Sequence, residues 1–420
     1  MKLTGRRVIA DLQELRRLTS DERGGAQRVA WGPVWRQARA WFSKKLHDEV
    51  GLSTHVDAAA NLWSTFKGSG RGPALVIGSH LDSVPSGGWL DGALGVVVGL
   101  EVFRRAKANG TPVDIHVVDW ADEEGARFGR SLTGSAASAG SLDPRKELAH
   151  LVDRQGVKLP DALAENGVQL NRMLGAHTYF KSLKAGAYLE LHIEQGPVLE
   201  ELRKPVGVVL GTMGVERHSL RFIGQAAHSG AAPLHLRKDA FLAAAEFALA
   251  TRAISIKYSG KTPKSRVVAT CGVVKVEPNF VTAVPGSTEI SIDMRALDAK
   301  VLAKMLREAK AAAQQAAKRH QVKLEWNHLW DINPRLFDET LMGFVRASIK
   351  EVTGGATELP SGPLHDAAEM QPLVPTAMVF AQSSPGISHT RIEDTPKAAL
   401  DISIKSFLLT VDKTLAHLAR

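Results

Sequence analysis

Short apolar runs alternate with longer amphipathic stretches along this chain of 420 residues. The runs at 74–78, 113–120 and 374–380 have the length and the branched residues of buried strands. Spacings of three and four between apolar positions predict helices over 8–19 and 397–418. Buried strands that alternate with helices are typical of an α/β domain. We therefore expect an α/β fold in which helices flank a mixed sheet.

The N-terminal part of this pattern contains two neighbouring strands, Leu62–Phe66 and Ala74–Gly78. The segment between them includes Gly-Ser-Gly-Arg-Gly, and glycines in such a position are typical of turns. The pattern therefore predicts a β-hairpin here.

A different pattern occupies the middle of the chain. Between residues 216 and 330 the predicted elements follow the order strand, helix, strand, strand, helix, strand, which is the order of a ferredoxin-like domain. A chain of this length is expected to form two domains. We expect a first domain made of residues 1–211 and 333–420, with an inserted ferredoxin-like βαββαβ domain at 212–332.

Composition supports a globular protein, because 44% of the residues are hydrophobic. The longest apolar runs are much shorter than a membrane span, and the charged N-terminus lacks the apolar core of a signal peptide. A single cysteine, Cys271, excludes an intrachain disulfide. We expect a cytoplasmic protein that makes no membrane contact.

The net charge of +9 raises the possibility of a nucleic-acid partner. However, the Lys and Arg residues are spread along the chain and are mixed with Asp and Glu on the predicted helices. The glycine-rich segments also match neither common phosphate-binding loop. We expect no nucleic-acid partner, and a solvated basic surface that attracts anionic small molecules.

Side chains suited to metal binding follow four of the predicted strands. Imidazole and carboxylate groups bind zinc, manganese and similar divalent ions, and one carboxylate can bridge two ions. Each of these residues alone is more often an ordinary loop residue, but the agreement of four segments is far more specific. The set predicts a binuclear metal site with the ligands His80, Asp91, Glu124, His192 and His389.

Two further carboxylates accompany this set. Glu123 and Glu124 are adjacent at a strand end, so that one can bind metal while the other faces the substrate and accepts a proton from water. Asp82 lies two residues after His80, where its carboxylate can hold the far nitrogen of that imidazole.

These segments belong to longer motifs that span residues 78 to 395. The chain resembles the two-metal amidohydrolases related to aminoacylase, in the branch of N-carbamoyl-L-amino-acid hydrolase, allantoate amidohydrolase and β-ureidopropionase. The motifs are GSHLDSVPSGGWLDGALG, EEGARF, LHIEQGPVLE, AAHSGAAPLHLRKDA, SIDMR, HDAAEM and GISHTRIEDT. The resemblance implies hydrolysis of a linear amide or ureide C–N bond, in an N-carbamoyl-L-amino acid, allantoate or N-carbamoyl-β-alanine.

The resemblance also implies a role for each site residue. Asp91 would bridge two ions per subunit, zinc or manganese with cobalt or nickel also acceptable. His80 would bind one ion and Glu124 the other, with His192 and His389 completing the set. Glu123 would act as the general base.

Further roles concern the substrate and the partner subunit. The inserted domain would act as a lid and form a homodimer, and His228 would reach the neighbouring subunit's site to stabilise the oxyanion. Gln195 and Arg295 would bind the substrate, with Arg295 paired to its carboxylate.

Two positions depart from the usual motifs of the branch. Thr282 replaces an Asn before Val-Pro-Gly, and Pro363-Leu364 replaces Ala-Gly before His-Asp-Ala. Both lie at the substrate end of the site, so they favour as an alternative an amidase of N-acyl amino acids or dipeptides. A catalytically silent binding protein is a more remote alternative, because the complete metal set and Glu123 argue for catalysis.

Overall fold

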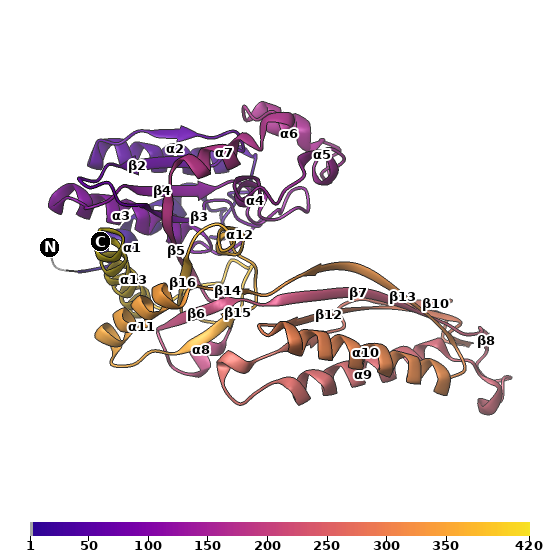
Figure 1. The fold of residues 1–420 in the computed structure, drawn as a ribbon. Coiled ribbons are helices and arrows are strands. Elements are labelled where there is room, and N and C mark those ends of the chain that lie inside the picture. The colour runs from indigo at the N-terminus through magenta and orange to yellow at the C-terminus, as the bar shows by residue number, and fades with distance from the viewer. Residues whose placement is uncertain (1–2) are drawn as a thin grey trace. The chain divides into compact units, whose positions relative to one another are not determined.

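The structure is a computed structural model that describes residues 3–420 (Figure 1). The chain folds into two compact units. Unit 1 comprises Met1–Leu210, Phe337–Leu359 and Pro363–Arg420, and unit 2 comprises Gly211–Leu336 and Pro360–Gly362. The chain therefore leaves unit 1 to form unit 2 and then returns.

A mixed sheet flanked by helices forms the centre of unit 1, as the sequence predicts. Its strand order is β1-β2-β4-β3-β5-β16-β6-β14, and β15 also pairs with β6. The pairs β3–β4, β3–β5 and β5–β16 are parallel, and the other pairs along this path are antiparallel. The strands are β1 Thr54–Val56, β2 Leu62–Phe66, β3 Ala74–His80, β4 Ile115–Trp120, β5 Ala185–Ile193, β6 Val206–Thr212, β14 Arg335–Leu336, β15 Glu358–Ser361 and β16 Thr376–Ala381.

The predicted hairpin is wrong, because β4 lies between β2 and β3. The glycine-rich segment does not turn back on itself. It contacts the residues that precede β4: Gly70 N–H donates to Pro112 O at 2.8 Å, and Gly68 N–H donates to Asp114 Oδ1 at 2.8 Å. Every residue of β3 is buried, so this strand needs a neighbour on each side, and β4 and β5 provide them.

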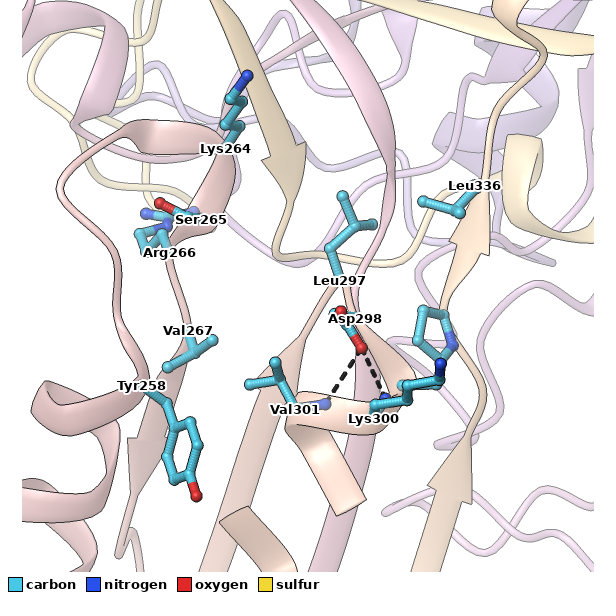
Figure 2. A pocket seen from close by; sticks show the side chains of 12 residues that line it. Tyr258, Lys264, Ser265, Arg266, Val267, Leu297, Asp298, Lys300, Val301 and Leu336 are labelled. Carbon is cyan, nitrogen blue, oxygen red and sulfur yellow. Dashed lines mark hydrogen bonds between the residues drawn. The ribbon is translucent and has the colours of Figure 1, made fainter. Parts of the chain in front are cut away.

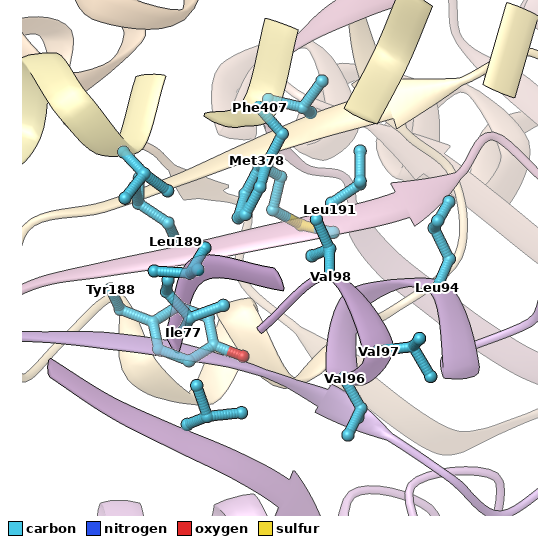
Figure 3. Packing of buried hydrophobic residues seen from close by; sticks show 14 of the residues in the cluster. Ile77, Leu94, Val96, Val97, Val98, Tyr188, Leu189, Leu191, Met378 and Phe407 are labelled. Carbon is cyan, nitrogen blue, oxygen red and sulfur yellow. The ribbon is translucent and has the colours of Figure 1, made fainter. Parts of the chain in front are cut away.

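Helices cover the sheet through apolar side chains (Figure 3). Leu94 and Val98 of α3 and Phe407 of α13 belong to the same buried cluster as Leu189 and Leu191 of β5. Alternate residues of a strand point to opposite faces, so Tyr188, Glu190 and His192 face away from Leu189 and Leu191. The longer helices of unit 1 are α1 Arg6–Thr19, α2 Pro33–Lys45, α3 Ala93–Asn109, α11 Glu339–Thr353 and α13 Lys397–Leu418.

Shorter helices fill the connections of unit 1. Several of them lie between β4 and β5. The shorter helices are α4 Thr133–Ala139, α5 Pro144–Glu147, α6 Leu159–Glu165, α7 Gly175–Ser182, α8 Val198–Glu201 and α12 Asp366–Met370, with short turns at Leu46–Val50 and Leu170–Arg172.

Unit 2 is an antiparallel sheet with two long helices. The strand order is β10-β12-β7-β13, β9 also pairs with β12, and β8 pairs with β11. Buried and half-buried residues alternate along β12, and its buried residues join the helices in one cluster. The elements are β7 Gly214–Ile223, β8 Ala227–His228, α9 Ala240–Tyr258, β9 Val268–Thr270, β10 Val274–Glu277, β11 Ala283–Val284, β12 Ser287–Ala296, α10 Ala299–Arg319 and β13 Lys323–Ile332, with turns at Leu234–Leu236 and Pro263–Ser265.

The strand that the predicted order places directly after the first helix of this region is divided into β9 and β10. Both pieces pair with β12, at its two ends. Between them Val273 exchanges hydrogen bonds with Ser291, whose Oγ accepts from Val273 N–H at 3.0 Å and whose N–H donates to Val273 O at 3.0 Å. A side-chain oxygen thus replaces one carbonyl of the ladder, and the regular strand is interrupted there.

A hollow of about 650 Å³ opens in unit 2 beside the first turn of α10 (Figure 2). Asp298 caps this helix by accepting from the N–H groups of Lys300 and Val301. None of the sequence-predicted site residues lines the hollow. Across residues 3–420, no helix has both the length and the apolar character needed to cross a membrane.

Candidate metal centre

The five predicted metal ligands all belong to unit 1 and lie at the ends of its parallel strands or in the segments that follow them. His80 is the last residue of β3, His192 is the second-last residue of β5, and Glu124 follows β4. Asp91 lies just before α3, and His389 lies in the segment after β16. Because parallel strands end at the same edge of a sheet, the fold gathers these residues there.

Asp91 is the centre of the cluster. Its Oδ1 lies 3.3 Å from His192 Nε2 and 3.8 Å from His80 Nε2. Its Oδ2 lies 3.8 Å from His389 Nε2, which in turn is 3.3 Å from Glu124 Oε2. The structure therefore contains two ligand triads that share Asp91, namely His80–Asp91–His192 and Asp91–Glu124–His389.

The unsatisfied polar atoms of the cluster fit a divalent cation. Asp91 Oδ1, Glu124 Oε1 and His192 Nε2 are buried, and none has a hydrogen-bond partner among the described residues. A buried polar atom without a partner costs about 1–3 kcal/mol, so native proteins rarely leave three together. Carboxylate and imidazole donors at this spacing suit zinc or manganese, which would satisfy all three atoms.

Two main-chain carbonyls orient the histidines. His80 Nδ1–H donates to Asp82 O at 3.1 Å, and His192 Nδ1–H donates to Ile193 O at 2.9 Å. Each bond fixes the tautomer that leaves the Nε2 lone pair pointing toward Asp91. Burial lowers the pKa of His80 to about 3, so this imidazole is neutral and ready to bind a metal at neutral pH.

The Asp82 carboxylate has a different task from the predicted one. Its Oδ1 is 3.6 Å from His80 Nδ1, beyond hydrogen-bonding distance. It accepts instead from the backbone N–H of Glu123 at 3.2 Å and of Glu124 at 3.1 Å. The main-chain oxygen of Asp82 supports His80, while its side chain holds the two glutamates.

Glu123 lies beside the triads without joining either. Its Oε2 is 3.6 Å from His80 Nε2. Burial raises the pKa of Glu123 well above its usual value, and the nearby charges of Asp366 and Glu124 raise it further. A carboxylate with a raised pKa is suited to accepting and returning a proton near neutral pH.

The carboxylates of the cluster repel one another. Burial and the charge of Asp91 raise the pKa of Glu124 well above its usual value. Burial also acts to raise the pKa of Asp91, but the interaction with His192, 3.3 Å away, outweighs it and lowers that pKa. Bound cations would relieve this repulsion among the carboxylates.

Gln195 contacts the cluster directly. Its Nε2 donates to Asp91 Oδ2 at 2.9 Å, and its N–H donates to Ser383 Oγ at 3.0 Å. The sequence interpretation assigned Gln195 to substrate binding. The structure places its amide at the shared ligand, on the side of His389.

Three residues near the cluster received no role from the sequence. Glu190 and His365 form a further group with His192, and the His365 and His192 ring centroids are 4.3 Å apart. Glu190 accepts from Ser79 Oγ at 3.1 Å and Ala367 N–H at 3.0 Å. Glu190 could have been found from the sequence, because it lies two residues before His192 and therefore on the same face of the strand. His365 could have been found as the first residue of the motif HDAAEM.

The third of these residues is Glu393, which holds the loop that carries His389. Glu393 Oε2 accepts from Ser388 Oγ at 2.5 Å and from His389 N–H at 3.1 Å. His389 has a φ of 59°, an uncommon conformation for a residue other than glycine. Glu393 is buried and supports this strained ligand.

The remaining predicted site residues lie in unit 2. His228 is exposed, and Thr282 is its neighbour, since Ala283 pairs with His228 and Ser229 N–H donates to Thr282 O at 2.9 Å. Arg295 lies at the other end of the sheet, where it donates to Asp293 Oδ1 at 2.8 Å and Gly362 O at 2.8 Å. Within unit 2, His228 and Thr282 are therefore together and Arg295 is apart.

Comparison with known proteins confirms the resemblance. Residues 76–413 match the profile of Peptidase family M20/M25/M40. An N-carbamoyl-L-amino acid amidohydrolase of Geobacillus stearothermophilus is 34% identical over 398 residues, covering 94% of this chain and 95% of that protein. Allantoate deiminase 2 of Glycine max is 29% identical, covering 96% and 88%.

A solved structure agrees along the whole length. An amidase of the hydantoinase/carbamoylase family from Burkholderia multivorans superposes with a TM-score of 0.89 at 29% identity, covering 100% of this chain and 99% of that one. The matched region includes all five ligands and Glu123. The chain therefore belongs to peptidase family M20/M25/M40, a family of metal-dependent enzymes, and within it to the amidohydrolase branch that cleaves C–N bonds.

Proposed function

We propose that this protein hydrolyses the carbamoyl C–N bond of an N-carbamoyl-L-amino acid or of a related ureido acid such as allantoate or N-carbamoyl-β-alanine. The observation that carries the proposal is the pair of triads that share Asp91, with Glu123 beside them. The names of the relatives support the substrate class. We propose two divalent ions per chain, zinc or manganese, one in each triad.

We assign the role of general base to Glu123, which lies beside the triads and belongs to neither. When bound, the cations would polarise the carbamoyl carbonyl and lower the pKa of the attacking water. Glu123 accepts the proton from that water and returns it to the leaving nitrogen. Asp82 keeps the Glu123 backbone in place through its N–H, so the carboxylate stays directed at the reacting atoms.

The substrate carboxylate is assigned to Arg295, whose planar guanidinium suits bidentate recognition. In the present structure that guanidinium is bonded to Asp293 and to Gly362 O. Gln195 and Thr282 would complete the polar contacts to the substrate. Gln195 would exchange its bond to Asp91 for one to the substrate, because cations at the triads would take up the Asp91 oxygens.

Unit 2 is proposed to be a ferredoxin-like lid that also forms a homodimer. The order of its elements and the strand order β10-β12-β7-β13 support this assignment. Large apolar side chains on α9 are exposed, with Leu242 50%, Leu249 71% and Ile256 63% exposed. Their spacing of seven places them along one side of the helix, a surface that suits a second copy.

The geometry of unit 2 also supports a role for His228 at the partner's site. Arg295 pairs with Val215 at one end of β7, whereas His228 follows Ile223 at the other end. The eight residue steps from Val215 to Ile223 span roughly 25–30 Å, which exceeds the length of a carbamoyl amino acid. One unit 2 therefore cannot place both side chains on one substrate, which supports a site completed by His228 of a second subunit.

A second candidate is an amidase of N-acyl amino acids or dipeptides with the same metal chemistry. The observations that favour it are Thr282 and Leu364, which depart from the motifs of the branch at the substrate end. Ammonia release distinguishes the two, because only a carbamoyl or ureido substrate yields ammonia.

The test uses the full chain, stripped of metal and reloaded with manganese or zinc. Ammonia release is measured on N-carbamoyl-L-amino acids, allantoate and N-carbamoyl-β-alanine, and amino acid release on N-acetyl amino acids and dipeptides. Metal-dependent ammonia release that Glu123→Gln abolishes supports the proposal. Cleavage of acyl substrates alone would favour the second candidate, and turnover of neither would favour a binding protein.

A further inference from the structure

Leu81 lies between His80 and Asp82, and buried charged side chains bind both its N–H and its carbonyl group. Its N–H donates to Asp119 Oδ1 at 2.6 Å, and its carbonyl accepts from Arg28 Nε at 2.6 Å. Both distances are at the short end for such bonds, as expected when one partner is ionised. The chain is therefore fixed immediately after the ligand His80.

Arg28 also reaches the far end of the same loop. Its Nη2 lies 3.5 Å from Asp91 O. Its backbone is paired with Ser83, whose N–H donates to Arg28 O at 3.1 Å and whose Oγ accepts from Arg28 N–H at 3.1 Å. One residue thus contacts the loop next to His80 and again at Asp91, the ligand that the two triads share.

The charge of Arg28 is unusual in its setting. The residue is 0% exposed, and no carboxylate lies within ion-pair distance of it in the described chain. Burial acts to lower the pKa of Arg28, and the charges of Asp91, Asp82 and Glu124 oppose that shift. A buried cation needs compensation, and here the carboxylates around the metal centre supply it collectively.

Other buried arginines of unit 1 are paired differently. Arg104 forms an ion pair with Asp11 at 2.7 Å and bonds Glu49 at 2.7 Å, near the C-terminal end of α3. Arg39 forms an ion pair with Asp119 at 2.8 Å. Arg28 differs from them because its guanidinium donates hydrogen bonds to main-chain oxygens of the ligand loop. It also donates to Thr19 Oγ1, 3.4 Å from its Nη1.

We propose that Arg28 is a positioning residue of the metal centre, which sets the spacing of His80 and Asp91 and balances the charge of the clustered carboxylates. Arg28 lies outside the matched region 76–413, so the family profile assigns it nothing. The inference rests on the proposed function, because it requires that the two triads hold metal.

The experiment measures manganese binding by the metal-free full chain, using the electron paramagnetic resonance signal of free Mn²⁺, together with kcat and KM. Residues that support metal ligands affect metal affinity roughly 10–100-fold. We expect Arg28→Gln to weaken Mn²⁺ binding by about this factor and to lower kcat with little change in KM. Arg28→Lys keeps the charge but loses the second contact, so we expect an intermediate loss.

Arg104→Gln is the matched control, since it removes a buried arginine that does not touch the ligand loop. We expect it to lower the unfolding temperature without weakening Mn²⁺ binding. Wild-type Mn²⁺ affinity in folded Arg28→Gln would overturn the inference. If that variant does not fold, wild-type affinity in Arg28→Lys would overturn it. A wild-type chain that binds neither Mn²⁺ nor Zn²⁺ would instead overturn the proposed function.

Discussion

The chemistry of this protein is divided between two very different environments. The candidate metal ligands lie in unit 1, at the edge of the sheet where its parallel strands end. Four of the five are buried or half-buried, and His389 is exposed. The residues assigned to the substrate in unit 2 are exposed or half-buried. Arg295 lies near the end of β12, whereas His228 and Thr282 lie at the separate strand pair β8–β11.

This difference has a physical cause. Bond polarisation needs donors held rigidly and away from water, which a buried sheet edge provides. Recognition of a small acid requires groups that can approach and leave, which an exposed surface provides. The comparison predicts that changes in unit 1 affect turnover and metal binding, while changes in unit 2 affect substrate selection or depend on the partner subunit.

The largest effect is expected at Glu123. Because Glu123→Gln removes the proton acceptor and keeps the shape, kcat should fall roughly 10²–10⁴-fold. Mn²⁺ binding should remain near the wild-type level, since Glu123 belongs to neither triad. A loss of bound manganese equal to the loss of activity would show that Glu123 is a ligand.

A smaller effect is expected at His228, and it tests the division between subunits. Loss of one oxyanion donor in His228→Ala should lower kcat roughly 10²–10³-fold. If His228 acts across the dimer, mixing this variant with Glu123→Gln should restore activity, up to about a quarter of wild type for random pairing into dimers. No recovery after the subunits have been shown to exchange would mean that His228 acts within its own chain or not at all.

Arg295 should affect binding more than turnover. Arg295→Lys keeps the charge but loses the planar fork, so KM for a carboxylate substrate should rise by about tenfold or more. The substrate amide, which lacks the carboxylate, should show no such rise. Arg221→Lys, an exposed change on β7, serves as the control. Equal effects on acid and amide would remove Arg295 from carboxylate recognition.

The smallest effect concerns Glu393 and pH. Burial first, and then the charge of Asp91, raise the pKa of Glu393 to about 8 from its usual 4.5. A group with a raised pKa in the folded state stabilises it below the unfolded pKa, and that contribution is lost as pH rises through the folded pKa. Metal-free wild type should therefore lose stability between about pH 5 and pH 8 relative to Glu393→Gln, by on the order of 1 kcal/mol or more. Urea unfolding at both pH values measures this difference, and parallel pH profiles would contradict the expected ionisation.

The clustering of the candidate ligands was predictable because its signal is local. Each of His80, His192 and His389 follows an apolar run, so the strand pattern alone indicates that they meet at one sheet edge. The helix Lys397–Leu418 was predicted with its exact bounds for the same reason, since its amphipathic spacing is continuous.

Features that depend on distant segments were not predictable. The hairpin prediction was wrong because the pairing of strands depends on segments far apart in the sequence. Here β4 lies between β2 and β3 and pairs with both. Arg28 gave no signal, because its role depends on main-chain oxygens 53 and 63 residues away. Asp82 was assigned to the correct neighbourhood, but only the structure distinguishes its carbonyl from its carboxylate.

That carboxylate has a consequence for how the enzyme can change over evolutionary time. The Asp82 carboxylate accepts hydrogen bonds from the backbone N–H groups of both Glu123 and Glu124, so the positions of these two residues depend on one side chain. A mutation that shifts Asp82 would displace Glu123, the proposed proton acceptor, and Glu124, the proposed metal ligand, together. The positions of the two glutamates are therefore coupled, and we expect new substrate preferences to arise from residues outside this pair.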